Sequence, residues 1–251
     1  RGLVRHPYLH PVNLYLRKLH LGWKFKVLEV KDQGYLAFMS HLLYNRLFLP
    51  GIFNEPDLYY IAYTVARKRK FLPFYVSGTT HFYVDSEAVL SIYEQTFHGL
   101  AKEGFIDVVY DNKVRWSKQS RHRIHINLKK AKENGVKVDV LKRMDVDTFK
   151  EWYSNCYVYA YDGNPPFTYS QLHRYTEGLL EEGLEKFIVA TIDDKVVGGF
   201  AVLMDEYSNV AWYNLGAVCR EGRDVGAGYL LVVTAIDLVK EQNKVLELYG
   251  K

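Results

Sequence analysis

The sequence predicts an α/β (α+β) protein of two units, each a mixed, mostly antiparallel sheet flanked by helices, joined by a basic helix. Strand-like and helix-like patterns follow one another in both halves of the 251 residues. Residues 113–137 hold nine Lys or Arg and a single acid, Glu133. The charge is also divided, since residues 1–137 carry a balance of +11 and residues 138–251 a balance of −7. This division indicates two units with different electrostatic partners, or with each other as partners. We expect one unit at 1–112, the basic helix at 113–135 and the second unit at 136–251.

The second half opens with a strand and a helix. Residues 136–141 alternate and are rich in Val, as a short strand does. Asp145 is placed to cap a helix that continues through Cys156 with apolar residues at helical spacing. The cluster Tyr161-Asp162-Gly163-Asn164-Pro165-Pro166 then predicts a turn.

A second helix, three strands, a third helix and a last strand complete this half. Thr168 and Gln171 form a capping-box pattern, and Gly183 ends the helix that they begin. Asp193 and Asp194 mark a hairpin turn. The expected strands are residues 186–191, 196–204, 210–218 and 245–249, with a loop at 220–228 and a helix at 229–242 before the last of them.

The first half shows a weaker form of the same order. Residues 58–66, 71–76 and 81–84 read as strands, Ser86 caps a helix that Gly104 ends, and residues 105–110 read as a strand. Both halves therefore share the order β-β-β-α-β, which suggests an internal structural duplication.

Residues 116–133 form the basic helix, which Asn134 and Gly135 end. One interpretation is a solvated helix that docks onto the acidic second unit. The other is a surface that binds an anionic substrate or a nucleic acid.

The strongest chemical signal is an Arg-x-x-Gly-x-Gly pattern between a strand and a helix. Its residues are Arg223-Asp224-Val225-Gly226-Ala227-Gly228. The first turn of a helix offers backbone N–H donors to a pyrophosphate, and the glycines let the backbone come close. Arg223 adds a charge-assisted contact. Position 231 is Leu, which argues against a dinucleotide-binding Rossmann loop, and the Gly-Lys-Ser/Thr of a Walker loop is absent.

In this position the pattern resembles the acyl-coenzyme A (acyl-CoA) loop of the GNAT N-acyltransferases. The segment Arg121-His122-Arg123-Ile124-His125-Ile126-Asn127-Leu128-Lys129-Lys130-Ala131-Lys132-Glu133-Asn134-Gly135-Val136 is similar to the helix before the second domain of Fem-type tandem-GNAT proteins. Those proteins are related to the aminoacyltransferases that build peptidoglycan cross-bridges. The ending Leu248-Tyr249-Gly250-Lys251 is also similar. The resemblance covers roughly residues 58–251 and implies two GNAT-like units.

The resemblance implies that acyl-CoA lies in an opening between the fourth and fifth strands of the second unit. Backbone groups around Gly216 and Val218 would bind the pantetheine arm, and the loop from Arg223 to Gly228 would hold the pyrophosphate. The donor-binding residues are then Gly216, Val218, Arg223, Asp224, Val225, Gly226, Ala227 and Gly228. The implied reaction is direct attack by a small-molecule or peptide amine on the thioester.

Two alternatives remain open. The donor could be an aminoacyl-tRNA, whose backbone the basic helix could follow. The second unit could also be a binding module without catalysis. The first half lacks the Arg-x-x-Gly-x-Gly pattern, so we interpret it as a degenerate GNAT-like unit that shapes the acceptor site.

The catalytic residues depart from the family pattern. Trp212 stands where some GNAT enzymes have a Glu general base, and the chain stops before the helix that often supplies a Tyr acid. Counting by twos places Trp212, Asn214, Gly216 and Val218 on one face of the strand. No ready base lies on that face, so the amine could lose its proton through a water chain or to a neighbour such as Asp205 or Glu206. Our candidates for catalysis are Asn214, Asp205 and Glu206.

Composition limits the remaining classes. The chain is 48% hydrophobic and 25% charged, as in soluble globular proteins, and no stretch approaches the ~20 apolar residues of a membrane span. Cys156 and Cys219 form no disulfide framework, which fits a cytoplasmic location. His122 and His125 lie one helical turn apart without a third ligand in reach, so we expect no metal.

Overall fold

The structure is a computed structural model that describes residue 7 and residues 10–30, 34–40, 45–48, 52–53, 74–77, 118–206, 208 and 210–248. The expected strands at 58–66, 81–84 and 105–110, and the helix that Ser86 was expected to cap, lie outside these residues. The strand expected at 71–76 corresponds in part to β5 (Phe74–Ser77).

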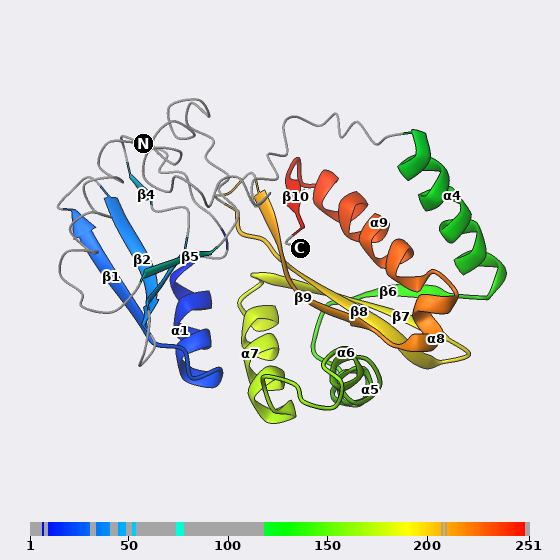
Figure 1. Cartoon of the computed structure of the whole chain (residues 1–251), viewed down its shortest axis with the longest axis horizontal. Coiled ribbons are helices and arrows are strands. Elements are labelled where there is room, and N and C mark those ends of the chain that lie inside the picture. Colours follow the sequence, from blue (N-terminus) through cyan, green and yellow to red (C-terminus); the bar gives the residue numbers. More distant parts are fainter. Residues whose placement is uncertain are drawn as a thin grey trace.

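The second half folds around a five-stranded sheet in the order β10-β9-β8-β7-β6. Neighbouring strands run antiparallel except β9 and β10, which are parallel. The bounds are β6 (Lys137–Leu141), β7 (Glu185–Ile192), β8 (Lys195–Leu203), β9 (Val210–Val218) and β10 (Val245–Glu247). This mixed, mostly antiparallel sheet with helices on both sides confirms the predicted α+β class (Figure 1).

Two helical layers cover this sheet (Figure 1). On one side lie α5 (Val146–Trp152), a π-helical segment (Tyr153–Tyr157), α6 (Val158–Ala160) and α7 (Tyr169–Glu181). On the other lie α4 (Lys118–Glu133) and α9 (Ala227–Lys240), and α9 packs against β7 and β8. The core on the α5 side centres on Phe149, Trp152 and Phe187, which are fully buried, with ring centroids 5.1–5.6 Å apart.

The caps and turns of this half form as their sequences predict. Thr168 and Gln171 make the reciprocal capping box of α7. Asp145 accepts a hydrogen bond from the backbone N–H of Thr148 and caps α5. Asp193 and Asp194 both have positive φ, at 46° and 63°, as a tight hairpin turn requires. The predicted loop 220–228 is partly helical, since α8 (Arg220–Asp224) occupies its first half and α9 begins at Ala227.

The first half contains a second sheet, as predicted, but four of its strands and a helix before them were not expected from the sequence patterns. The sheet has the order β1-β2-β3-β5, with β4 paired to β2, and β3 and β5 run parallel. Its strands are β1 (Phe25–Val30), β2 (Gly34–Ser40), β3 (Asn45–Phe48), β4 (Ile52–Phe53) and β5. The helix α1 (Pro11–His20) precedes β1 in the chain and lies beside α7 (Figure 1). The division into two domains remains a proposal.

The basic helix α4 packs on α9 through one face. Ala131 is fully buried, Ile124 and Asn127 are half-buried, and the described Lys and Arg side chains of α4 are exposed. Among the described residues, the ion pair of α4 is internal, between Lys129 and Glu133 at 3.7 Å, and none joins α4 to the acidic residues of 136–248. The described contacts of α4 with the second half are therefore those of its uncharged face, and its charges remain in solvent.

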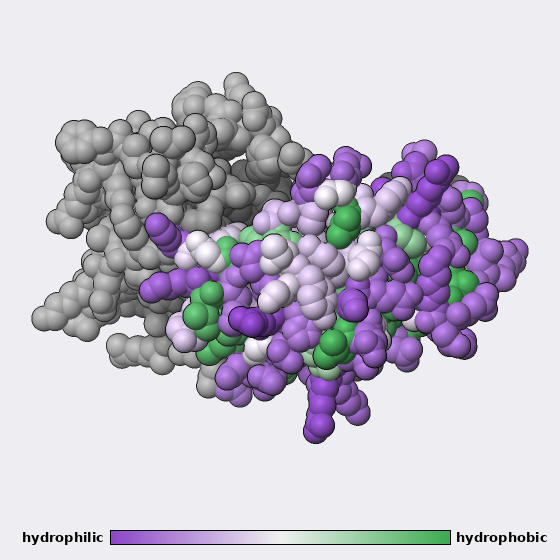
Figure 2. Space-filling model, turned by 90° about the horizontal axis from the view of Figure 1, so that it is seen from below, coloured by the Kyte–Doolittle hydropathy of each residue, from purple (hydrophilic) through white to green (hydrophobic). Residues whose placement is uncertain are grey.

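The opposite side of the molecule, which carries α5, α6, α7 and α1, is hydrophilic over most of its described surface (Figure 2). Its apolar residues form separate small areas. Among the described residues, no helix has both the length and the apolar character to cross a bilayer.

Candidate active site

An irregularity in β9 organises the candidate site. The pairing of β8 with β9 shifts between Ala201 and Val202, which face Leu215 and Tyr213. Asn214 is therefore an extra residue with no partner in β8, a β-bulge. The predicted alternation along this strand is wrong, because the bulge reverses the faces on its two sides.

The bulge separates β9 into two sets of side chains. Tyr213, Gly216 and Val218 share the face of Phe200, toward α9, because residues directly opposite in a pair point the same way. Trp212, Leu215 and Ala217 share the other face, toward α5 and α7. Trp212 therefore does not share a face with Gly216 and Val218, as the simple alternation required.

One edge of β9 is open beyond the bulge. Strand β10 pairs with residues 210–212 of β9 through Val245–Glu247, and no described strand continues along the rest of β9 on that side. The carbonyl oxygen of Gly216 accepts a hydrogen bond from the Tyr213 hydroxyl at 3.2 Å instead of from a neighbouring strand. Beyond the bulge, the backbone donors and acceptors on this side of β9 have no partner strand among the described residues and can meet a ligand.

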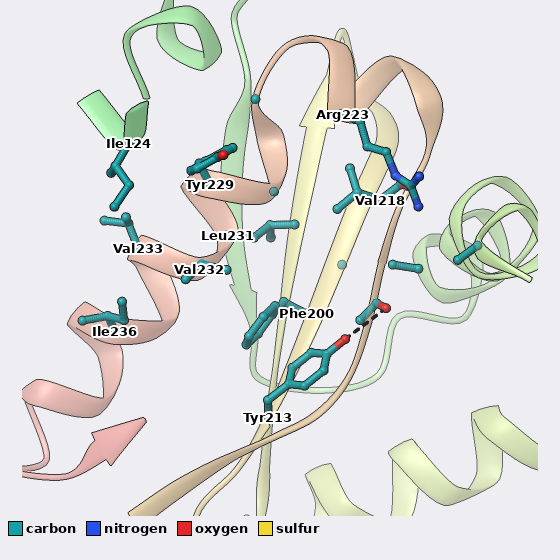
Figure 3. A pocket seen from close by; sticks show the side chains of 16 residues that line it. Ile124, Phe200, Tyr213, Val218, Arg223, Tyr229, Leu231, Val232, Val233 and Ile236 are labelled. Atoms are coloured by element: carbon teal, nitrogen blue, oxygen red, sulfur yellow. Dashed lines mark hydrogen bonds between the residues drawn. The ribbon is translucent and has the colours of Figure 1, made fainter. Parts of the chain in front are cut away.

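A cavity of about 550 Å³ lies at this edge, between β9, α9 and α4 (Figure 3). Its walls are mainly apolar and include Ile124, Phe200, Leu231, Val232 and Ile236. Among the described residues that line it, the polar side chains are those of Tyr213, Arg223 and Tyr229, and none is Asp, Glu or His. Burial raises the pKa of the Tyr213 phenol to about 12, so its hydroxyl keeps its proton at neutral pH.

The N-terminus of α9 forms one end of this cavity. Gly226 caps the helix with φ +83°, and a Cβ there would lie 2.6 Å from the Asn127 carbonyl oxygen of α4. Only glycine combines that left-handed backbone with so close a neighbour. At Gly228 a Cβ would make an ordinary 3.6 Å contact with Val218. The exposed Arg223 guanidinium lies over the Tyr159 ring, and its Nε donates to the Val218 carbonyl oxygen at 3.1 Å.

The structure places the eight predicted donor-binding residues in two groups. Five of them line the cavity, namely Gly216, Val218, Arg223, Gly226 and Gly228. The other three, Asp224, Val225 and Ala227, do not line it; Asp224 is exposed, Val225 half-buried and Ala227 fully buried. Their assignment as ligand-binding side chains remains a prediction, although the backbone of Ala227 belongs to the first turn of α9.

The three predicted catalytic residues lie away from the cavity walls. Asp205 is buried and its carboxylate accepts a hydrogen bond from the backbone N–H of Ser208 at 2.7 Å, which fixes the turn between β8 and β9. Glu206 is exposed in the same turn. Asn214 points to the α7 face, where it bonds to Glu185 and Arg17.

Sequence reasoning missed the buried polar cluster around Asn214. Glu185 is 1% exposed, and burial raises its pKa to about 8 against the opposing effects of Asn214 and Arg17. A period of two from Phe187 already places Glu185 on the inward face of β7, so the sequence held a signal for it. No such signal marks Arg17, because α1 was not predicted.

The other residues considered from sequence take structural roles. The Cys219 sulfur accepts the backbone N–H of Gly222 at the start of α8, and Cys156 is fully buried. Burial raises the pKa of Cys156 to about 12, which disfavours a nucleophilic thiolate. His122 and His125 are exposed on α4, while His81 and His98 lie outside the described residues. In the described part of the chain, no three His, Cys, Asp or Glu side chains gather as metal ligands would.

Comparison with known proteins identifies the fold. No family model and no curated protein matches the sequence. Among solved structures, FemX has 13% identity and a TM-score of 0.58, covering 95% of this chain and 82% of its own. The C-terminal domain of a protein named as a lysylphosphatidylglycerol synthetase, from Agrobacterium fabrum, has the same identity and TM-score, with 94% and 73% covered. The L-PGS structure from Bacillus licheniformis has 10% identity and a TM-score of 0.55, with 99% and 77% covered.

These likenesses show a shared fold, and they extend over nearly the whole chain. At 13% identity, the likeness to FemX shows the fold alone. It covers 95% of this chain and therefore reaches beyond residues 58–251, to which the sequence resemblance was confined.

Proposed function

We propose that this protein is an N-acyltransferase that transfers an acyl group from acyl-CoA to an amine. The observation that carries the proposal is the cavity at the open edge of β9, which ends at the N-terminus of α9. An extended pantetheine arm needs backbone partners along a strand, and a pyrophosphate needs convergent N–H donors at a helix start. This cavity supplies both at its two ends.

The residues present suit each part of such a donor. The apolar walls suit the carbon chain, and the backbone of Gly216 and Val218 faces the position of the amide groups. The N–H groups of Ala227 and Gly228 belong to the first turn of α9, where no intrahelical partner exists. Arg223 is exposed, so rotation of its side chain would bring the guanidinium to a phosphate.

The chemistry then depends mainly on positioning. The amine nitrogen attacks the thioester carbonyl, the C–N bond forms, and the C–S bond breaks to release the CoA thiolate, with proton transfer from the amine to solvent or to the thiolate. The described cavity walls hold no carboxylate or imidazole, so the amine must arrive as the free base. Alignment at the open strand edge and backbone donors at the carbonyl oxygen supply the rate enhancement.

A second candidate takes the aminoacyl group of an aminoacyl-tRNA as donor. It is favoured by the exposed Arg121, Arg123, Lys129, Lys130 and Lys132 of α4, the helix that also contributes Ile124 to the cavity. The name lysylphosphatidylglycerol synthetase also describes attachment of an amino acid, in a protein of the same fold. A non-catalytic binding module remains the third candidate.

Thermal unfolding with coenzyme A and acetyl-CoA tests the first candidate. A ligand at about 100 times its dissociation constant should stabilise the protein by about 2.7 kcal/mol and raise the melting temperature. Transfer of the acetyl group to a panel of amines, followed by release of free thiol, then separates an enzyme from a binding module. An unchanged melting temperature at millimolar ligand would exclude the CoA proposal.

Filter retention of tRNA over a range of salt concentrations tests the second candidate. Phosphate contacts from α4 would make the logarithm of the affinity fall linearly with log salt, with a slope of about −0.7 to −0.9 per contact. Tight, steeply salt-dependent binding together with no response to CoA would favour the tRNA donor. Weak binding without that slope would leave the basic helix as a solvated face.

A further inference from the structure

The side chain of Asn214 lies between a cation and a carboxyl group on the α7 face of the sheet. Its Oδ1 accepts a hydrogen bond from Nη2 of Arg17 at 2.5 Å, and its Nδ2 donates to Oε2 of Glu185. The carboxamide dipole is thus aligned, with its oxygen toward the guanidinium and its nitrogen toward the carboxyl group. Such an arrangement lowers the energy of the guanidinium and of the carboxyl group on the two sides of the carboxamide.

Two more side chains close this cluster from the helices. The Tyr175 hydroxyl of α7 lies 2.7 Å from Oδ1 of Asn13, to which it donates, and 3.2 Å from Oδ1 of Asn214. Nε of Arg17 donates to the same Asn13 oxygen at 3.2 Å. The Arg17 guanidinium also lies over the rings of Trp23 and Tyr175, at 4.9 and 5.1 Å. The buried Arg17 therefore joins α1 to β9 by its hydrogen bond to Asn214 and to α7 by its contact with the Tyr175 ring, and Asn214 continues the connection to Glu185 of β7.

This cluster is built into the interior. Arg17 is 6% exposed, and Asn13 and Tyr175 are 0% and 1% exposed. Oε1 of Glu185 is buried without a hydrogen-bond partner. Burying a guanidinium and an incompletely bonded carboxyl group opposes folding, so a purely structural sheet would be more stable with apolar side chains here. The arrangement calls for a role beyond holding the sheet together.

The bulge connects this cluster to the cavity on the other face. Tyr213 and Gly216 are three residues apart and would point to opposite faces of a regular strand. The extra residue Asn214 puts both on the α9 face, where the Tyr213 hydroxyl reaches the Gly216 carbonyl (Figure 3). The ring lies so close that a Cβ at Gly216 would be 3.0 Å from it. The hydrogen bonds that hold Asn214 therefore also determine the position of the Tyr213 side chain in the cavity.

We propose that Arg17, Asn214 and Glu185 form a positioning network that holds the β9 bulge, and that through it helix α1 of the first half sets the Tyr213 hydroxyl and Gly216 carbonyl of the cavity. These three side chains act from the α7 face and do not line the cavity. The first half of the chain then contributes to the donor site through Arg17. The effect on donor binding rests on the proposed function, whereas the effect on β9 does not.

The test compares Arg17→Met with Lys18→Met, a neighbouring exposed residue of α1, in the full chain. Hydrogen exchange of the β9 amides is measured without ligand, and coenzyme A affinity is measured by calorimetry. We expect Arg17→Met to speed exchange at residues 213–216 and to weaken CoA binding about tenfold, within the range found for coupled networks. Lys18→Met should match the wild type in both measurements.

A double-mutant cycle with Tyr213→Phe separates positioning from general loss of structure. If the network acts through Tyr213, Arg17→Met should weaken CoA binding by less than about threefold in the Tyr213→Phe background. Equal losses in both backgrounds, or wild-type β9 exchange in Arg17→Met, would overturn the proposal. If Arg17→Met does not fold, Tyr175→Phe takes its place in the same cycle. If the wild type binds no CoA, the donor proposal fails, and the exchange measurement alone decides on the network.

Discussion

The two faces of β9 differ: one borders an apolar cavity, and the other holds a cluster of hydrogen-bonded polar side chains. The single extra residue Asn214 determines which side chains lie on each face. Toward α9, Tyr213, Gly216 and Val218 border a cavity of about 550 Å³ whose described walls carry no carboxylate. Toward α7, the half-buried Asn214 hydrogen-bonds to Arg17, Tyr175 and Glu185, whose own side chains have little or no solvent exposure. One face has open apolar space and the other has closely packed polar groups.

This difference shows which face of β9 gives the site its rigidity. An open apolar cavity does not hold its own shape, because its walls lack contacts on one side. Hydrogen bonds are directional, so those on the α7 face restrict the position of the strand more closely than apolar packing does. The hydrogen bonds of Asn214 on the α7 face therefore hold the bulge in place, and the bulge in turn fixes Tyr213 and Gly216 at the cavity.

Filling the cavity beside the Tyr213 ring should have the largest effect. Gly216→Leu places a side chain where a Cβ alone would already lie 3.0 Å from the Tyr213 ring and 3.1 Å from the Gly199 carbonyl oxygen. We expect CoA affinity to fall by at least about 100-fold, the equivalent of roughly 2.7 kcal/mol, as measured by calorimetry. Leu215→Ala, on the other face of the same strand, should lower the free energy of unfolding and leave CoA affinity unchanged. Equal affinities for Gly216→Leu and the wild type would place the donor elsewhere.

Removing the titratable carboxyl group of Glu185, on the α7 face, should change how the free energy of unfolding depends on pH. The pKa of Glu185 is raised to about 8 by burial, while Arg17 and Asn214 lower it, so between about pH 4.5 and 8 the folded protein keeps a proton that the unfolded chain releases. The contribution of this group to the free energy of unfolding therefore falls as pH rises through that interval, and levels off above it. Glu185→Gln should remove the fall and be more stable than the wild type at pH 8 by a few kcal/mol, with near equality at pH 5.

Denaturant unfolding at several pH values measures this difference. Glu181→Gln, a change of the exposed acid at the end of α7, is the matched control and should leave the pH profile unchanged. A constant difference between Glu185→Gln and the wild type from pH 5 to pH 8 would contradict the raised pKa.

The sequence predicted the second half well where local rules are strong. Thr168 with Gln171, the Asp193-Asp194 turn and the Arg223 to Gly228 pattern each determine their structure within a few residues. The bulge at Asn214 could not be predicted, because it depends on the pairing with β8, which no local pattern encodes. Arg17 was missed for the same reason, since its role exists only through α7, β7 and β9. Asn214 was a catalytic candidate because of the alternation that the bulge breaks, and Asp205 and Glu206 were candidates because that alternation placed no base on the same face.

The two glycines at the start of α9 give the comparison with the smallest expected effect. They differ in backbone conformation and in the room available for a Cβ atom. Gly226 has φ +83°, and a Cβ there would meet the Asn127 carbonyl oxygen at 2.6 Å. Gly226→Ala should therefore reduce the free energy of unfolding by about 2 kcal/mol, from left-handed strain and the displacement of α4. Gly228 is helical and has room for a methyl group, so Gly228→Ala should increase it by about 0.5–1 kcal/mol.

The same pair separates stability from donor binding. If a pyrophosphate lies against the first turn of α9, the methyl group of Gly228→Ala stands between the phosphate and the backbone N–H donors. That variant should then be more stable than the wild type in denaturant unfolding and yet bind coenzyme A about tenfold more weakly in calorimetry, since 1.4 kcal/mol of lost contact suffices. Pantetheine, which has no pyrophosphate, is the control ligand and should bind both proteins equally. A Gly228→Ala variant that gains stability and keeps full CoA affinity would show that the phosphates do not reach α9, and the loop from Arg223 to Gly228 would lose its assigned role.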